Sequence, residues 1–290
     1  MELTILGSGS PIPDPTRAGT SLVIETGSKT VLVDCGPGAV EGLMEAGINP
    51  KAIDSVIFTH HHMDHNASFF HFVISSWMLG RQSLSVYGPD GTENLIEALH
   101  LIYESDFEYR ESLGRSLDGV NEIQTGRVDD SFSLQIGNCS VSALPVDHSI
   151  ETFALRFDDE QTGESFVFTS DTAPVDGLSE FAAGADVLLH DCSVGPMLES
   201  PPEDKPTWEK FFDPDQAYID RLREVHCTPE ECGQTAAEAD VEKLVLTHLT
   251  PYLDPDGLKR NAGCEFDGPI VVAEDGMHLT PRTATAESTR

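Results

Sequence analysis

Four histidines and one aspartate stand together between residues 60 and 65, in the segment HHHMDH, directly after an apolar run that predicts a short buried strand. Imidazole and carboxylate groups are costly to bury side by side unless they have partners. In an extended loop, side chains two residues apart point the same way. The spacing therefore allows His60 and His62 to bind one metal ion, while Asp64 and His65 bind a neighbouring ion.

Three further candidates for metal binding stand just past apolar runs elsewhere in the chain: His148 after ALPV, Asp171 after FVFTS and His248 after LVLT. If these runs are strands, their ends are rigid supports at one edge of a sheet, where sites on α/β scaffolds are built. Zinc favours imidazole nitrogen with some carboxylate oxygen, and catalytic zinc sites leave a coordination position for water. With one oxygen on each ion, Asp171 is suited to bridge two metals.

The elements that must position these side chains alternate between strands and helices, and the second half of the chain resembles a repeat of the first. Residues 158–164 predict the turn of a hairpin. Thr228 and Glu231 have the spacing of a capping box at the start of a helix. Strands are expected at residues 3–6, 21–25, 30–34, 55–58, 84–87, 132–136, 140–145, 153–157, 166–169, 187–190 and 243–247, and helices at 39–46, 68–79, 93–103 and 229–239.

The charge is strongly acidic. Fifty acidic residues face 17 basic ones, of which only six are Lys, for a formal net charge of −33 spread along the whole chain. Such a surface repels itself in dilute salt and suits multimolar salt, where the Debye length is about 3 Å or less. We therefore expect a halophilic, salt-accumulating archaeal origin, with an ordinary acidic cytosolic protein as the alternative. The charge also argues against tight electrostatic binding of nucleic acid.

Composition and simple sequence patterns limit which classes of protein the chain can belong to. No run reaches the roughly 18 apolar residues of a membrane span, and the N-terminus lacks the pattern of a signal peptide, so we expect a cytoplasmic protein. The six cysteines form no CxxC pair and are expected to be free thiols. No GxSxG elbow or P-loop occurs. One domain over residues 1–280, followed by a disordered tail at 281–290, accounts for the length.

HHHMDH resembles the HxHxDH motif of the metallo-β-lactamase superfamily, and the later candidates follow in the order of that family. The resemblance implies an α/β fold, an αββα sandwich of two mixed sheets flanked by helices. It also implies two zinc ions, with manganese, iron or cobalt as alternatives. The implied ligands are His60, His62 and His148 for one metal and Asp64, His65 and His248 for the other, with Asp171 bridging.

Several stretches resemble the ribonuclease Z and arylsulfatase-like branch of this superfamily: LGSGSPIPDPTRAGTSLVIE, LGRQSLSVYGPDG, HDCS, HCTPEECGQTAAEADVEKLVLTHLTPY and VVAEDGM. The resemblance implies that His226 donates a proton or stabilises charge at the scissile group, and that Asp191 orients His226. It further implies that Asp64 doubles as a general base. Asp191 is one methylene shorter than the Glu of the family, which leaves its reach open.

Ribonuclease Z carries a long, basic, glycine-rich arm that binds tRNA. In the chain, this arm is inserted between the positions that match His148 and Asp171. Here these residues are 23 apart and a simple hairpin joins them. The missing arm counts against tRNA as the main substrate. The sequence therefore favours a phosphodiesterase that acts on a small-molecule or nucleotide substrate, without contact with a membrane.

Two alternatives stay open: an arylsulfatase-like or lactonase-like hydrolase of small esters, and a metal-binding scaffold without turnover. A homodimer is expected from the resemblance, with the apolar helix at residues 68–79 as a possible interface. Residues 195–215 are rich in proline and contain three aromatic side chains, so they suit either a lid or a surface insertion.

Overall fold

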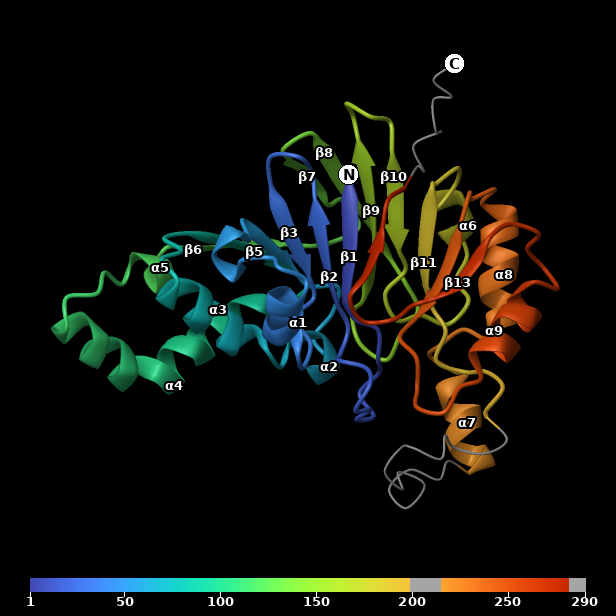
Figure 1. Ribbon diagram of the computed structural model, residues 1–290, viewed down its shortest axis with the longest axis horizontal. Helices are drawn as coiled ribbons and strands as arrows, with labels where there is room; N and C mark the ends of the chain where they lie inside the picture. Colours follow the sequence, from blue (N-terminus) through green and yellow to red (C-terminus); the bar gives the residue numbers. More distant parts are fainter. Residues whose placement is uncertain (199–214, 282–290) are drawn as a thin grey trace.

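Two seven-stranded sheets pack face to face with helices on their outer sides, in a computed structural model that describes residues 1–198 and 215–281 (Figure 1). The α/β sandwich predicted from the family resemblance is confirmed. The predicted tail lies outside the described residues apart from residue 281. Residues 199–214, which make up most of the segment interpreted as either a lid or a surface insertion, also lie outside them. Within the described ranges, no helix has both the length and the apolar character needed to cross a membrane.

The first sheet has the order β14-β1-β2-β3-β4-β5-β6. β3 to β6 run parallel, whereas β14, β1 and β2 join antiparallel. β3 and β4 are buried almost throughout, which explains why they read as continuous apolar runs. β5 is buried at alternate positions, and β6 is mostly exposed. The strands are β1 (Glu2–Gly7), β2 (Ser21–Glu25), β3 (Thr30–Val33), β4 (Ser55–Ile57), β5 (Leu84–Gly88), β6 (Ile123–Arg127) and β14 (Met277–Leu279).

The second sheet repeats this plan in the order β13-β12-β11-β10-β9-β8-β7. β10 to β13 run parallel, and β7, β8 and β9 pair antiparallel in turn, with β9 joining β10. The strands are β7 (Ser133–Ile136), β8 (Cys139–Pro145), β9 (Phe153–Asp159), β10 (Ser165–Phe168), β11 (Val187–Asp191), β12 (Leu244–Thr247) and β13 (Ile270–Val272).

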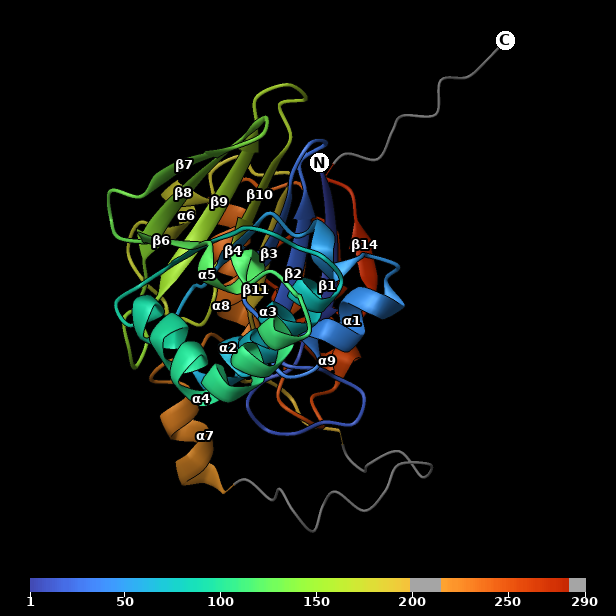
Figure 2. The ribbon, with the colours of Figure 1, turned by 90° about the vertical axis from the view of Figure 1, so that its left-hand side faces the viewer.

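Helices cover the outer face of each sheet (Figure 2). On the first sheet lie α1 (Ala39–Glu45), the 3-10 helix η1 (Pro50–Ala52), α2 (Met63–Asn66), α3 (Phe69–Met78), α4 (Thr92–Ser112) and α5 (Asp118–Asn121). On the second lie α6 (Leu178–Phe181), α8 (Pro229–Glu238) and α9 (Pro255–Ala262), with α7 (Gln216–Leu222) at the lower end in Figure 1. A separate apolar cluster fills each helix–sheet interface.

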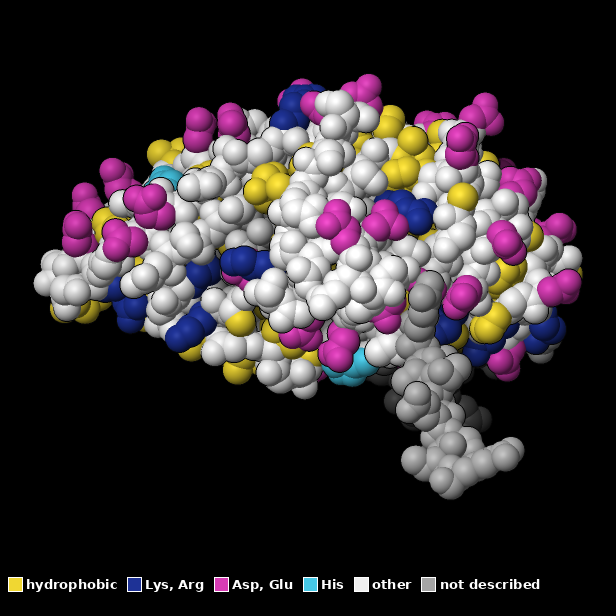
Figure 3. Space-filling view, turned by 90° about the horizontal axis from the view of Figure 1, so that it is seen from above, with side chains coloured by type: hydrophobic (Ala, Val, Ile, Leu, Met, Phe, Trp, Pro, Cys, Tyr) yellow, Lys and Arg dark blue, Asp and Glu magenta, His cyan; other side chains and the backbone are white. Residues whose placement is uncertain are grey.

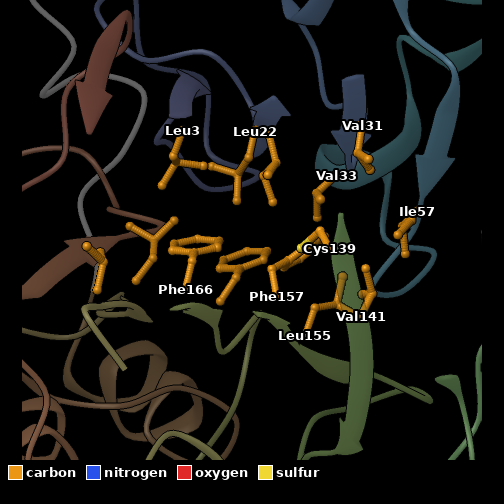
Figure 4. Close-up of a cluster of buried hydrophobic side chains, with 14 of the residues drawn as sticks. Leu3, Leu22, Val31, Val33, Ile57, Cys139, Val141, Leu155, Phe157 and Phe166 are labelled. Carbon is orange, nitrogen blue, oxygen red and sulfur yellow. The ribbon is translucent and has the colours of Figure 1, made fainter. Parts of the chain in front are cut away.

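The central core lies between the two sheets (Figure 4). Leu3 and Leu22 from the first sheet face Phe157 and Phe166 from the second, and all four are buried. Burying each such side chain contributes roughly 1.5–3 kcal/mol. This core fixes the two sheets against each other and so fixes the loops that leave their ends.

The prediction of a helix over residues 93–103 was too short, because α4 extends to Ser112. Residues 104–112 have a weak apolar pattern, but the structure supplies two contacts that hold them helical. Phe107 is buried edge-on against Trp77, and Arg110 Nε donates to Asp106 Oδ2 one turn earlier at 2.7 Å. The other predicted boundaries agree to within one or two residues.

The apolar side of α3 packs against its own sheet, since Phe69, Phe72, Val73 and Trp77 are all buried. The helix therefore offers a partner much less apolar surface than its sequence suggests. Homodimer formation through residues 68–79 stays a prediction.

Loops from the two sheets meet at the carboxyl ends of the parallel strands, at the lower end of the view in Figure 1. Three residues there adopt a positive φ that non-glycine residues rarely take: Asp34 (57°), Ser170 (55°) and His248 (55°). Such backbone conformations cost of order 1 kcal/mol or more and cluster at functional sites. This edge is therefore the place to look for a site.

Candidate metal centre

The seven side chains predicted as metal ligands lie together at this edge. They form two groups in which the nitrogen and oxygen atoms of different residues lie within 4.8 Å of one another. The first group is His60, His62, His148 and Asp171, and the second is Asp64, His65, Asp171 and His248. Asp171 belongs to both, which is the position that a bridging carboxylate requires.

In the first group, three ring nitrogens point at one another. His62 Nδ1 lies 3.1 Å from His60 Nε2 and 3.2 Å from His148 Nε2. Asp171 Oδ2 lies 3.7 Å from His60 Nε2 and 3.8 Å from His148 Nε2. Three imidazoles and a carboxylate that converge in this way match the donor set of a catalytic zinc site.

In the second group, His248 Nε2 lies 3.1 Å from Asp64 Oδ2 and 3.2 Å from Asp171 Oδ2. His65 Nε2 lies 3.3 Å from Asp171 Oδ1 and 3.6 Å from Asp64 Oδ2. All four side chains are buried. Two histidines and two carboxylates again form a donor set suited to a divalent ion.

Two buried atoms in the second group make no hydrogen bond within the part of the chain that the structure describes: His65 Nε2 and Asp171 Oδ1. An unsatisfied buried polar atom costs roughly 1–3 kcal/mol. A divalent cation between them would satisfy both atoms. The residues present therefore fit a metal centre.

Asp34 supports this centre and was missed in the sequence. Its Oδ2 accepts a hydrogen bond from His65 Nδ1 at 2.7 Å and another from Thr59 Oγ1 at 2.8 Å. Asp34 follows β3, which pairs in parallel with β4, the strand before the HHHMDH segment. A carboxylate at the end of a neighbouring strand was the available signal, because ligating histidines usually donate their other ring nitrogen to such a group.

Three other histidines also have a polar partner at Nδ1, the ring nitrogen that faces away from the centre. His148 Nδ1 lies 3.1 Å from the carbonyl oxygen of Val225, His60 Nδ1 lies 3.1 Å from Thr59 Oγ1, and His248 Nδ1 lies 2.7 Å from Ser193 Oγ. These contacts direct the Nε2 atom of each ring toward the centre.

The buried charges of the centre shift the pKa values of its histidines in opposite directions. Burial, together with the neighbouring His65, holds the pKa of His60 well below its ordinary value. Burial also acts to lower the pKa of His65, but the carboxylates of Asp171 and Asp34 raise it to about 10. The lowered pKa of His60 favours the neutral imidazole that a metal ligand requires, whereas the raised pKa of His65 reflects the two carboxylates that flank its ring.

His226 and Asp191 form a pair beside the centre. His226 Nδ1 donates to Asp191 Oδ2 at 2.8 Å, so the shorter side chain of Asp reaches the ring. The ring of His226 stacks on that of His248, with 5.2 Å between the centroids. Burial acts to lower the pKa of His226, but the carboxylate of Asp191 outweighs it and raises that pKa above the ordinary value.

The loop that carries the histidines is packed tightly against the loop after β3. Cys35 N donates to the carbonyl oxygen of His65 at 2.7 Å, and Ser68 N donates to that of Cys35 at 3.0 Å. A Cβ on Gly36 would lie 2.1 Å from the carbonyl oxygen of Asp64, so only glycine allows this approach. Beside the loop, a cavity of about 750 Å³ borders Met63 and Asp64.

Comparison with known proteins identifies the family of the chain. Residues 29–249 match the model of a family described as a beta-lactamase superfamily domain. The chain is 30% identical over 282 residues to a ribonuclease Z of Mycobacterium bovis, covering 95% of this chain and 96% of the relative. It is 31% identical over 285 residues to a ribonuclease Z of Mycolicibacterium gilvum, covering 95% and 94%.

Solved structures share the fold. The metallo-beta-lactamase fold protein YhfI from Bacillus subtilis superposes with a TM-score of 0.74 at 22% identity, covering 96% of this chain and 98% of that one. The short form of human tRNase Z superposes with a TM-score of 0.69 at 22% identity, covering 98% and 100%.

These matches do not favour the arylsulfatase-like alternative, since both of these relatives are named ribonuclease Z and the match covers nearly their whole length. The chain therefore belongs to the metallo-β-lactamase superfamily and, within it, is a ribonuclease Z-like metal-dependent hydrolase.

Proposed function

We propose that the two groups hold two divalent metal ions, most simply zinc. His60, His62 and His148 bind one ion, Asp64, His65 and His248 bind the other, and Asp171 bridges them. The unsatisfied pair His65 Nε2 and Asp171 Oδ1 supports this assignment. Two such ions supply a water molecule of lowered pKa and neutralise charge that develops on a phosphoryl group.

The observation that carries the choice of reaction is the 2.8 Å contact between His226 and Asp191 next to the centre. Asp191 accepts a hydrogen bond from Nδ1, which leaves the N–H at Nε2 of the protonated ring to donate its proton to a leaving group. Hydrolysis of a phosphodiester expels an alkoxide that needs this proton. Asp64, which borders the cavity, is the candidate general base toward the attacking water.

The substrate that we propose is a small-molecule or nucleotide phosphodiester, with tRNA ranked below it. The hairpin between β9 and β10 closes through a short turn, where the Asp159 and Glu164 backbones pair at 2.8 Å. This part of the molecule therefore offers no arm to grip a large RNA, and the formal net charge of −33 repels phosphates.

The experiment compares three substrates on metal-loaded protein: bis(p-nitrophenyl) phosphate, p-nitrophenyl sulfate and a diribonucleotide. We expect the phosphodiesters to be hydrolysed and the sulfate to be a poor substrate. His226→Ala should lower kcat on the diribonucleotide about 100-fold or more. The loss should be much smaller on bis(p-nitrophenyl) phosphate, whose phenolate leaves without a proton.

His71→Ala, at an exposed position on α3, is the matched control and should leave both rates unchanged. Asp171→Ala should abolish turnover of every substrate. A preference for the sulfate, or an equal loss on both phosphodiesters in His226→Ala, contradicts the proposed reaction. Metal binding without any turnover would favour the scaffold alternative.

A further inference from the structure

A second pocket lies at the opposite end of the first sheet from the metal centre. It has a volume of about 480 Å³ and is bordered by Ser55 and Leu84, the first residues of β4 and β5. The HHHMDH segment follows the other end of β4. At about 3.3 Å per residue, the path from Ser55 to His60 spans roughly 16 Å. The pocket is therefore separate from the centre.

This pocket is basic in a protein that is strongly acidic. Its lining contains Lys29, Lys51 and Arg81 but one carboxylate, Asp54, whereas the whole chain has about three acidic residues for each basic one. Figure 3 views this end of the molecule and shows Lys and Arg side chains left of centre among many acidic ones. The remaining polar lining consists of amides and hydroxyls: Ser55, Gln82, Ser83, Ser85, Tyr87, Gln124 and Gln135.

Arg81 is the unusual residue of the lining, because its guanidinium is buried without a counter-charge. The residue is 5% exposed. Its Nε donates to Ser76 Oγ at 2.9 Å and its Nη2 to the carbonyl oxygen of Val73 at 3.2 Å. Across residues 1–198 and 215–281, Nη1 has no hydrogen-bond partner and the side chain forms no ion pair with a carboxylate. Burial lowers the pKa of Arg81 to about 10.

The other charges do not compensate Arg81. Asp54 is already engaged, since its Oδ1 accepts from Lys29 Nζ at 2.7 Å and its Oδ2 from the Thr30 amide at 2.9 Å. Lys51 makes no ion pair with any residue in the described ranges. The lining thus keeps a surplus of two positive charges, from Lys51 and Arg81. A bound anion would offset this surplus of positive charge.

We propose that this pocket binds a small molecule through a phosphate group, either inorganic phosphate or a phosphomonoester. The lysine ammonium groups at the pocket can donate the charge-assisted hydrogen bonds that a phosphate dianion accepts, the amides and hydroxyls add neutral donors, and the buried guanidinium of Arg81 contributes positive charge beneath them. The volume lies within the range of small-molecule sites. The site is independent of hydrolysis at the metal centre.

The test measures binding of inorganic phosphate and of adenosine 5′-monophosphate by equilibrium dialysis. It uses the Asp171→Ala protein, whose metal centre is incomplete, at the lowest KCl concentration that preserves the near-ultraviolet circular dichroism spectrum. We expect saturable binding that becomes about tenfold weaker in Lys51→Gln and in Lys29→Gln. Lys259→Gln, on the surface of α9, is the matched control and should bind like the parent.

The same two lysine substitutions in the otherwise unchanged protein should leave turnover of bis(p-nitrophenyl) phosphate as it was. Tighter binding of the nucleotide than of phosphate identifies a phosphomonoester as the ligand, and the reverse identifies inorganic phosphate. Absence of binding in the Asp171→Ala protein, or equal binding by the Lys51→Gln, Lys29→Gln and Lys259→Gln variants, overturns the proposal.

Discussion

The orientation of each imidazole decides what the candidate centre can do. His65 is hydrogen-bonded to the carboxylate of Asp34, and His248 to the hydroxyl of Ser193. The Ser193 hydroxyl also donates to Asp191 Oδ1 at 2.9 Å. The Ser193 hydroxyl thus links His248, a proposed metal ligand, to the pair formed by His226 and Asp191. Substitutions at these positions are therefore expected to act on ring orientation rather than on direct contact with a substrate.

Asp191 is the residue whose substitution tests the role of His226 as an acid. Its carboxylate raises the pKa of His226, and a general acid works only below its own pKa. Asp191→Asn removes the charge and lowers that pKa, so the alkaline limb of the kcat/KM profile on a diribonucleotide should shift to lower pH. Asp191→Glu keeps the charge and should keep the limb near its original position. Identical profiles for Asp191→Asn and the parent protein would argue against His226 as the acid.

Helix α8 positions His226, because this residue lies two positions before Thr228, the N-cap of the helix. The Thr228 hydroxyl accepts from the Glu231 amide at 3.4 Å, and the Glu231 carboxylate accepts from the Thr228 amide at 2.8 Å. This capping box was predicted from the sequence and is confirmed. It fixes the chain direction two residues after His226.

Thr228→Ala should therefore act on both stability and the reaction. Loss of an N-cap costs about 1 kcal/mol, which corresponds to a fall in Tm of about 2–4 °C. We also expect kcat on the diribonucleotide to fall while KM changes little, since His226 loses its fixed position. Thr228→Ser retains the cap and serves as the control in thermal unfolding and kinetics. An unchanged Tm would show that the cap contributes little here.

Much of the fold was readable because most of the parallel strands are short apolar runs with a polar residue at or just past their end. Val56 and Val245 illustrate this: both are fully buried, and a histidine of the centre follows each within a few positions. β6 was missed because Ile123 is its one apolar side chain, and β13 and β14 were missed because they have three residues each and depend on pairing with distant strands. Asp34 and Ser193 were missed for a related reason, since their roles arise from neighbours that only the tertiary fold brings together.

Across the whole molecule, the dominant property is self-repulsion. A formal net charge of −33 raises the free energy of the compact state in dilute salt. Screening reduces this cost as the Debye length falls from about 10 Å at 0.1 M to about 3 Å at 1 M salt. The halophilic origin inferred from composition stays a prediction.

Thermal unfolding in KCl tests that prediction. We expect Tm to rise between 0.1 and 2 M KCl, with most of the gain below about 1 M, where the Debye length changes most. Sucrose at equal osmolality adds no charge and separates screening from exclusion of the solute. A Tm that is highest in low-salt buffer would contradict adaptation to salt.

The placement of the proposed ligands also sets an order of events during synthesis. Asp64 and His248 meet in the centre although they lie 184 positions apart in the chain. At about 5–20 residues per second, roughly 10 to 40 s separate their emergence from the ribosome. Throughout that interval the HHHMDH segment is an incomplete chelator on a nascent chain. The second half of the polypeptide therefore decides when the proposed ligand set is complete.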